Sequence, residues 1–284
     1  MEQEESEIGF QALDDGNRDE VLDFLSRSPE DNVVPLFNIG HFGMDAGDTP
    51  FHGYYFGKRE GSGLTAAGVV FNLGSMFLHA LNEDAVSGMA EHIIAAGKPP
   101  FFVEGPKTHV ERLLVELEGR YDAAPKPMLC KRLLLRGRAN PDISTSGVRP
   151  SRLEDIDILT TLGRAMHREM FGAEGMDEHS FQELLRLQIE TSGAYLREID
   201  VEIVAKAEAT AVRPHAALIG GVYTVPAARG QGHATACVAA LCRHLLGTVE
   251  TIALTAEPGN PAAYRMYMRI GFTKAGDWIA VSFQ

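Results

Sequence analysis

Apolar and polar positions recur with clear periods along most of the second half of the chain. Alternation or a short apolar run predicts a strand, and apolar residues three or four positions apart predict a helix. Ser151 and Glu154 form a capping-box pattern, so a helix is expected to begin there. A tight turn at Asp200 predicts a hairpin. The predicted strands are 148–150, 195–199, 202–212, 216–225, 251–256 and 278–283, and the further helices are 178–190, 234–246 and 261–269.

The first half shows a similar but weaker pattern. Asn17 and Glu20 predict the start of a helix. Strands are expected at 53–57, 64–71, 76–81, 101–104 and 128–135, with helices at 83–96 and around 110–117. The similar order predicts two tandem copies of one mixed α/β fold. The polar stretch 136–147 lacks an apolar period, so the expected domains are 1–140 and 141–284.

The composition indicates a folded chain with a sizeable core. Apolar residues make up 45% and charged residues 23% of the 284 residues, unlike disordered chains. The net charge of -13 disfavours nucleic acid as a partner, because phosphate contacts need clustered Lys and Arg. No uncharged apolar run reaches the about 18 residues of a membrane span, and MEQEESEIGF lacks the layout of a secretory signal. Three cysteines without metal-ligand spacing predict a cytoplasmic protein without a metal, with buried thiols at Cys237 and Cys242.

A glycine-rich turn between a strand and a helix is the clearest candidate for a binding site. The predicted strand 216–225 leads through a proline-containing turn to Arg-Gly-Gln-Gly-His-Ala at 229–234. Glycines let the backbone approach a ligand closely, and amides at a helix N-terminus attract an anion such as a diphosphate. The turn lacks the Lys-Ser or Lys-Thr of a P-loop and the spacing of a Rossmann fingerprint. A plain tight connection is the alternative.

Two motifs in this region resemble the signatures of the GNAT superfamily of N-acetyltransferases. The first signature is Arg or Gln, two residues, Gly, one residue, then Gly or Ala. It is matched by Arg229, Gly232 and Ala234. The second is an Asn that leads a short helix containing Tyr and closing on Gly-Phe. It is matched by Asn260, Ala263, Tyr267, Gly271 and Phe272. The segment RPSRLEDID is similar to the first strand and helix of the family, so the resemblance covers the second half.

The resemblance implies transfer of an acetyl group from acetyl-CoA to a primary amine. The backbone of 222–224 would pair with the pantetheine arm like an added strand, and the amides of 230–234 would hold the diphosphate. Tyr267 would protonate the leaving thiolate as a general acid, with a core aromatic as its alternative role. His233 is expected to face solvent or to reach the phosphates through its backbone. The implied acyl-CoA-binding residues are Val222, Tyr223, Thr224, Arg229, Gly230, Gln231, Gly232, His233, Ala234 and Asn260.

The sequence does not identify the base that would deprotonate the amine. Two positions where family members carry Glu hold Leu218 and Thr255 here. The candidates that remain are water, Glu208, Glu202, His215 and Glu257, and each of these side chains also fits a solvated strand or turn position. The alternative to an enzyme is therefore a non-catalytic acyl-CoA-binding or sensing protein. A transferase of a longer acyl group is a third possibility, and the acceptor and the oligomeric state stay open.

The first half lacks both motifs. Asn82, Glu83 and Asp84 follow its corresponding strand, and acidic groups there oppose phosphate binding. We therefore expect a degenerate GNAT-like domain that shapes the acceptor cleft, binds another ligand or stabilises the fold.

Overall fold

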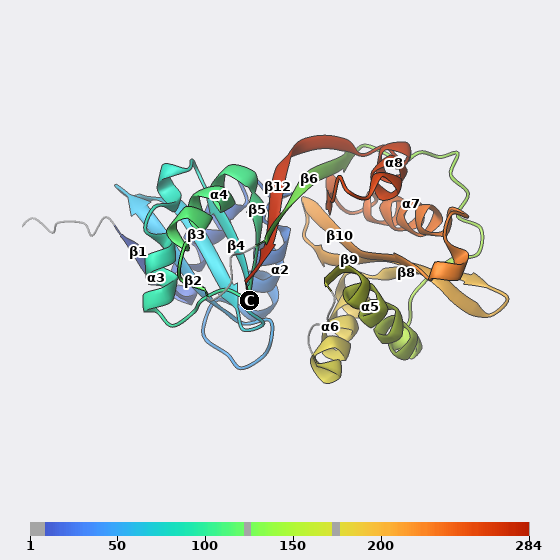
Figure 1. Ribbon diagram of the computed structural model, residues 1–284, viewed down its shortest axis with the longest axis horizontal. Coiled ribbons are helices and arrows are strands. Elements are labelled where there is room, and N and C mark those ends of the chain that lie inside the picture. The colour runs from blue at the N-terminus through green and yellow to red at the C-terminus, as the bar shows by residue number, and fades with distance from the viewer. Residues whose placement is uncertain (1–8, 122–125, 172–176, 284) are drawn as a thin grey trace, which may run out of the picture. The chain divides into compact units, whose positions relative to one another are not determined.

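The computed structural model describes residues 9–121, 126–171 and 177–283 (Figure 1). Residues 1–8, most of the acidic N-terminal segment, lie outside these ranges. The described chain has a mixed α/β fold, which confirms the predicted fold class. In the first half the elements are β1 Phe10–Leu13, α1 Arg18–Leu25, α2 Val33–Phe42, β2 Gly53–Glu60, β3 Gly63–Phe71, β4 Ser75–Ala80, α3 Met89–Ala95, β5 Phe102–Pro106, α4 Lys107–Glu116 and β6 Lys126–Arg136.

The second half repeats this order of strands and helices. Its elements are β7 Val148–Pro150, α5 Ile156–Phe171, α6 Glu178–Thr191, β8 Ala194–Ile199, β9 Glu202–Val212, β10 Ala216–Thr224, α7 His233–Leu245, β11 Thr251–Ala256, α8 Pro261–Ile270 and β12 Thr273–Ser282. Apart from short 3₁₀ turns, the order in each half is β-α-α-β-β-β-α-β-α-β.

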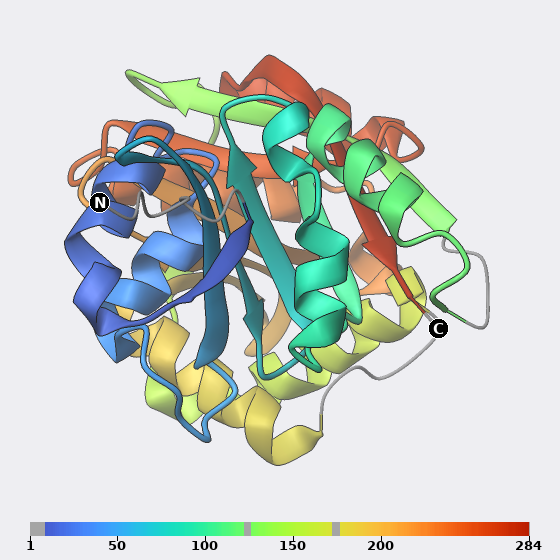
Figure 2. The ribbon, with the colours of Figure 1, turned by 90° about the vertical axis from the view of Figure 1, so that its left-hand side faces the viewer.

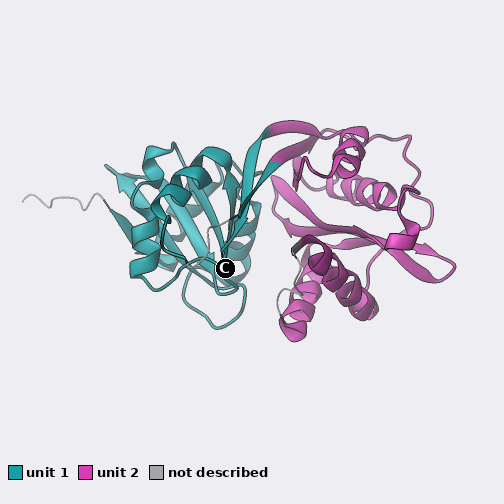
Figure 3. Cartoon of the chain, in the orientation of Figure 1, with its two compact units in different colours: residues 1–130, 276–284 teal, residues 131–275 magenta. Residues whose placement is uncertain are grey.

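The two compact units of the chain do not coincide with its two halves. Unit 1 is 1–130 with 276–284, and unit 2 is 131–275 (Figure 3). The strand order is β1-β2-β3-β4-β5-β12 in unit 1 and β6-β11-β10-β9-β8-β7 in unit 2. Each unit therefore completes its sheet with a strand from the other half. This differs from the expected division at residue 140, because antiparallel pairing joins β12 to β5 and β6 to β11 across long stretches of sequence.

Unit 2 has helices on both faces of its sheet (Figure 1). Ala205, Ala207 and Ala209 of β9 pack in a core with residues of α7 and α8. The alternating residues Lys206 and Glu208 face the other way, toward the side covered by α5 and α6. Both side chains are buried, so this strand has an apolar face and a charged face that are both covered.

Unit 1 has the same layered arrangement. Helices α1 and α2 cover one face of its sheet, and helices α3 and α4 cover the other (Figure 2). Buried side chains of each pair of helices form a core with the strands.

Several local features differ from the sequence expectations. The sequence pattern predicts neither strand β1 nor helix α2. The expected helix 83–96 is interrupted at Gly88, whose φ is +86°. At the start of the second half, Asp155 rather than Glu154 completes the cap, since its carboxylate accepts from the Arg152 N–H at 2.8 Å.

Other sequence expectations concern the cysteines and the membrane. All three cysteines are free and buried, which confirms the expectation for Cys237 and Cys242. In the described ranges, no helix combines the length and the apolar character that a bilayer crossing demands.

Candidate functional site

Strands β10 and β11 pair only along their first residues. Their parallel register runs from Ala216 with Thr251 to Leu218 with Ala253. On its other edge β10 stays paired with β9 as far as Thr224, through register shifts on either side of Gly220. Gly221 lies within the second shift and has a φ of +57°. The edge of β10 that faces β11 is therefore released beyond Leu218, and an extended ligand can pair with backbone there.

The carboxyl end of β10 leads directly into the glycine turn. A single 3₁₀ turn, Pro226–Ala228, is followed by Gly230 and Gly232, with φ values of +79° and +83°. A Cβ atom at either glycine would meet nothing within 4 Å. Helix α7 begins at His233, and no described side chain caps it. The turn thus presents open backbone at the positive end of a 13-residue helix, as an anion site requires.

The structure corrects the expected environment of His233. Its side chain is buried, so the expectation that it faces solvent is wrong. Position 233 is the first helical residue, where the imidazole turns inward while the N–H group stays at the helix end. Gln231 is exposed, and Ala234 is partly exposed.

Asn260 and Tyr267 both belong to the short helix that follows β11. Asn260 caps α8, because its Oδ1 accepts from the Ala263 N–H at 3.0 Å. Since β10 and β11 are parallel, Asn260 and the glycine turn lie at the same edge of the sheet. Tyr267 is 8% exposed and lies in the core formed by α7, α8 and the sheet. Burial raises the pKa of its hydroxyl, and the nearby Cys242 adds to the rise, so the phenol is protonated at neutral pH.

A buried charged pair lies against the shifted part of β10. Glu208 is the register partner of Gly220, and its carboxylate fills the space where a Cβ of Gly221 would stand. Lys206 donates to Glu208, and the two side chains are 0% and 7% exposed. His167 of α5 faces this pair. Burial lowers the pKa of its imidazole, and Lys206 lowers it further.

The other three candidate bases lie elsewhere. Glu202 lines an open hollow with Arg149 and Glu198 near the hairpin. His215 precedes β10 and pairs with Glu250 at 3.0 Å, largely exposed. Glu257 follows β11 and is exposed. Of the four, Glu208 is the one beside the released part of β10.

Glu169, near the end of α5, was not identified from the sequence. Its Oε1 accepts from the Tyr223 hydroxyl at 2.7 Å, and its Oε2 accepts from Arg229 Nη2 at 2.6 Å. These bonds hold the pKa of Glu169 below its usual range, with the bond from Tyr223 contributing most. Lys206 was also missed, although the alternation of Ala with Lys206, Glu208 and Thr210 signals one shared face. The alternation does not reveal that helices cover this face.

The equivalent region of unit 1 is different. Helix α3 has only seven residues, and a carboxylate from α4 occupies its N-terminus. Glu116 accepts from the Gly88 N–H at 3.2 Å and from the Ala90 N–H at 3.4 Å. The amides that face open space in unit 2 are thus already bound to an internal anion in unit 1.

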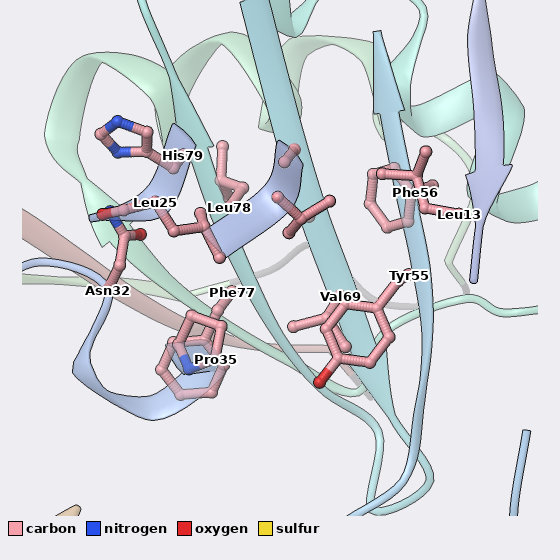
Figure 4. A pocket seen from close by; sticks show the side chains of 13 residues that line it. Leu13, Leu25, Asn32, Pro35, Tyr55, Phe56, Val69, Phe77, Leu78 and His79 are labelled. Carbon is pink, nitrogen blue, oxygen red and sulfur yellow. The ribbon is translucent and has the colours of Figure 1, made fainter. Parts of the chain in front are cut away.

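A small cavity of unit 1 lies between α1, α2 and strands β2 to β4 (Figure 4). Its volume is ≈ 10 Å³, which suits about one water molecule. The buried Tyr55 hydroxyl lies among its lining residues and has no hydrogen-bond partner in the described part of the chain. The cavity is too small for the arm of a nucleotide cofactor. No three His, Cys, Asp or Glu residues within the described ranges are grouped to hold a metal ion.

Comparison with known proteins finds a family match within the second half of the chain. Residues 159–272 match the model of the acetyltransferase (GNAT) family. No curated protein matches the chain significantly.

Several solved structures are similar to nearly the whole chain. A Drosophila protein is 15% identical with a TM-score of 0.69, and covers 97% of this chain and 98% of its own. A GNAT-family acetyltransferase of Colwellia psychrerythraea is 15% identical with a TM-score of 0.57. The match covers 97% of this chain and 99% of that protein. A GCN5-related N-acetyltransferase of Sphaerobacter thermophilus is 14% identical with a TM-score of 0.60. The match covers 96% of this chain and 94% of that protein. At these identities the likeness shows a shared fold.

Proposed function

We propose, from the match of residues 159–272 to the model of the acetyltransferase (GNAT) family, that the chain transfers an acetyl group from acetyl-CoA to a primary amine. The observation that carries the proposal is the release of β10 from β11 after Leu218, followed by the open glycine turn into α7. A free strand edge suits an amide-containing arm, and the adjoining helix end suits a diphosphate. Both features lie on one continuous segment.

Acetyl-CoA is the co-substrate in this proposal, and the residues present fit it. The backbone of Val222, Tyr223 and Thr224 pairs with the pantetheine arm, and the amides of 230–234 bind the diphosphate. Asn260 contacts the arm from the neighbouring strand end. The open space at Gly230 and Gly232 admits phosphate oxygens, which a Cβ atom would obstruct.

Two side chains move protons in the proposed reaction. The amine forms a bond to the acetyl carbon while the carbon–sulfur bond breaks. Glu208 accepts the proton that the amine loses, directly or through water, and Tyr267 donates a proton to the departing thiolate. Glu208 is placed beside the shifted part of β10, and the raised pKa of Tyr267 keeps its phenol protonated. The fixed positions of these groups lower the entropic cost of the reaction.

We further propose that one acetyl-CoA binds per chain. The same order of elements in both halves supports a tandem origin, with a degenerate copy in the first half. Glu116 already saturates amides at the start of α3, and a carboxylate at that position repels phosphate.

The experiment combines a binding assay with a rate assay. Isothermal titration of the full chain with CoA measures affinity and stoichiometry, and thiol release from acetyl-CoA over a panel of primary amines measures transfer. Binding of one CoA with amine-dependent thiol release is the expected result. Binding without release for any amine favours a non-catalytic acyl-CoA-binding or sensing protein, and absence of binding overturns the proposal. Parallel assays with longer acyl-CoA donors test the choice of acetyl.

A further inference from the structure

The stretch formed by β10 and the glycine turn, which is proposed to bind acetyl-CoA, is called the donor segment. The Glu169 carboxylate connects helix α5 to two of its residues, Tyr223 and Arg229. One oxygen accepts from the Tyr223 hydroxyl at 2.7 Å, and the other accepts from Arg229 Nη2 at 2.6 Å. Arg229 is held at a second point, because its Nε donates to the Thr224 carbonyl at 3.1 Å. Its guanidinium also lies over the Tyr223 ring, 5.5 Å from the centroid. Glu169 thus fixes both the end of β10 and the start of the glycine turn.

The arrangement leaves Arg229 able to contact an anion. A guanidinium has five N–H donors, and the bonds to Thr224 and Glu169 use one on Nε and one on Nη2. The side chain is 49% exposed and stands next to the turn at Gly230. Arg229 can therefore keep Glu169 while its remaining donors point to a ligand.

We propose that Glu169 is a positioning residue of the acyl-CoA site, which orients Arg229 toward the diphosphate and Tyr223 along the pantetheine arm. This inference rests on the function proposed above. An isolated exposed ion pair contributes little, but this carboxylate joins two residues that are held together by further contacts. Holding them before the ligand arrives reduces the ordering cost of binding.

A competing effect of Glu169 has the opposite sign. Its negative charge lies near the expected diphosphate and repels it. The pair with Arg229 cancels this charge locally, and both side chains are close to half exposed, so solvent screens the residual repulsion. Orientation of Arg229 and Tyr223 is therefore the larger effect, and removal of the carboxylate weakens binding.

The test measures CoA affinity of the full-length chain by isothermal titration. Glu169→Ala is expected to raise the Kd three- to tenfold, and Glu169→Gln, which keeps one acceptor oxygen and the shape, to raise it less. Glu198→Ala is the matched control. It removes a carboxylate that accepts from Arg149 at 2.8 Å, outside the donor segment, and leaves the Kd unchanged. The melting temperature of each variant shows whether it is folded. If Glu169→Ala does not fold, the comparison is made with the isosteric Glu169→Gln variant.

A double-variant cycle separates positioning from general structure. If Glu169 acts through Arg229 and Tyr223, Glu169→Ala changes the Kd less than twofold in an Arg229→Ala, Tyr223→Phe background. An equal effect in both backgrounds overturns the inference. If the wild-type chain binds CoA and the Glu169→Ala variant binds it equally well or more tightly, the inference about Glu169 is wrong and the proposed function is unaffected. A wild-type chain that does not bind CoA overturns the proposed function as well.

Discussion

Gly221 leaves the space that the Glu208 carboxylate occupies. A Cβ atom at position 221 would overlap Glu208 Oε2, and the φ of +57° is a conformation that glycine adopts at low cost. The glycine in β10 and the acid in β9 therefore depend on each other, at the point where the register of the two strands shifts.

Gly221→Ala is expected to lower stability and to displace Glu208. Backbone strain alone costs about 1–2 kcal/mol for a non-glycine residue at positive φ, and the overlap adds to it. Gly137→Ala is the control, because Gly137 has a φ of +85° and open space around its Cβ position. The melting temperature should fall further for Gly221→Ala than for Gly137→Ala. Equal falls would mean that the contact with Glu208 is unimportant.

Glu208→Gln tests the proposed base. The amine-dependent rate is expected to fall by about 10²–10⁴-fold, the usual contribution of general base catalysis, while acetyl-CoA affinity is unchanged. Glu257→Gln is the control, since Glu257 is exposed after β11, and it should keep the wild-type rate.

The substitution also leaves the buried Lys206 without its carboxylate, which is costly. The double variant Lys206→Met, Glu208→Gln removes this complication. It should recover stability but not rate. A wild-type rate in the double variant would exclude Glu208 as the base.

The sequence predicts local elements and fails where distant residues combine. The glycine turn and the hairpin each depend on residues that are adjacent in the sequence, so the sequence predicts their positions closely. Helix α2 was missed because Val33, Pro35, Leu36, Phe37 and Ile39 are all buried, and a helix that is apolar on most sides lacks the expected period.

The same distinction between local and distant residues applies to the candidate site. The donor segment is one continuous stretch and is visible in the sequence. Glu169 meets Arg229 across 60 positions, and the sheet of each unit includes a strand from the other half. Such pairings depend on strand order and helix packing, which no local pattern encodes.

Gly232→Glu tests the diphosphate site. The added carboxylate lies at the start of α7 and opposes a diphosphate, so CoA binding should be lost. Gly119→Glu is the control, because Gly119 is also exposed, has a φ of +72° and has open space around it. Both variants carry similar backbone strain and one added charge. Titration should show normal CoA affinity for the control, and equal effects of the two variants would remove the evidence for this site.

Two fragments with different boundaries test whether β6 belongs to the sheet of unit 2 and β12 to the sheet of unit 1. A fragment of residues 131–275 retains the pairing of β6 with β11 and is expected to fold and to bind CoA. A fragment of residues 146–284 loses β6 and exposes the edge of β11, and its β12 segment lacks β5. It is expected to aggregate, since unpaired strand edges associate. Size-exclusion chromatography and circular dichroism compare the two, and a folded, monomeric 146–284 fragment would contradict the strand assignment.

Tyr267→Phe at alkaline pH tests the burial of the phenol. The folded chain raises the pKa of Tyr267 above its usual value of about 10. The protonated form is thus favoured in the fold, so its stabilising contribution is complete below about pH 10 and is lost as pH rises further. Tyr267→Phe should therefore lose less stability than wild type between about pH 10 and pH 11. A parallel loss in both chains would show that Tyr267 is accessible to solvent.

The same variant at neutral pH decides whether Tyr267 acts in the reaction. A thiol has a pKa of about 8.5, so a thiolate leaves fairly well without help. A proton from Tyr267 is nevertheless expected to contribute about 10²–10⁴-fold to the rate. Because this interaction strengthens as the carbon–sulfur bond breaks, Tyr267→Phe should lower kcat and leave acetyl-CoA affinity nearly unchanged. The ring contact with Phe272, at a centroid distance of 5.8 Å, survives the change and preserves the core. If Tyr267 is only a core aromatic, Phe gives a wild-type rate and Tyr267→Ala alone destabilises the chain, which excludes the acid role.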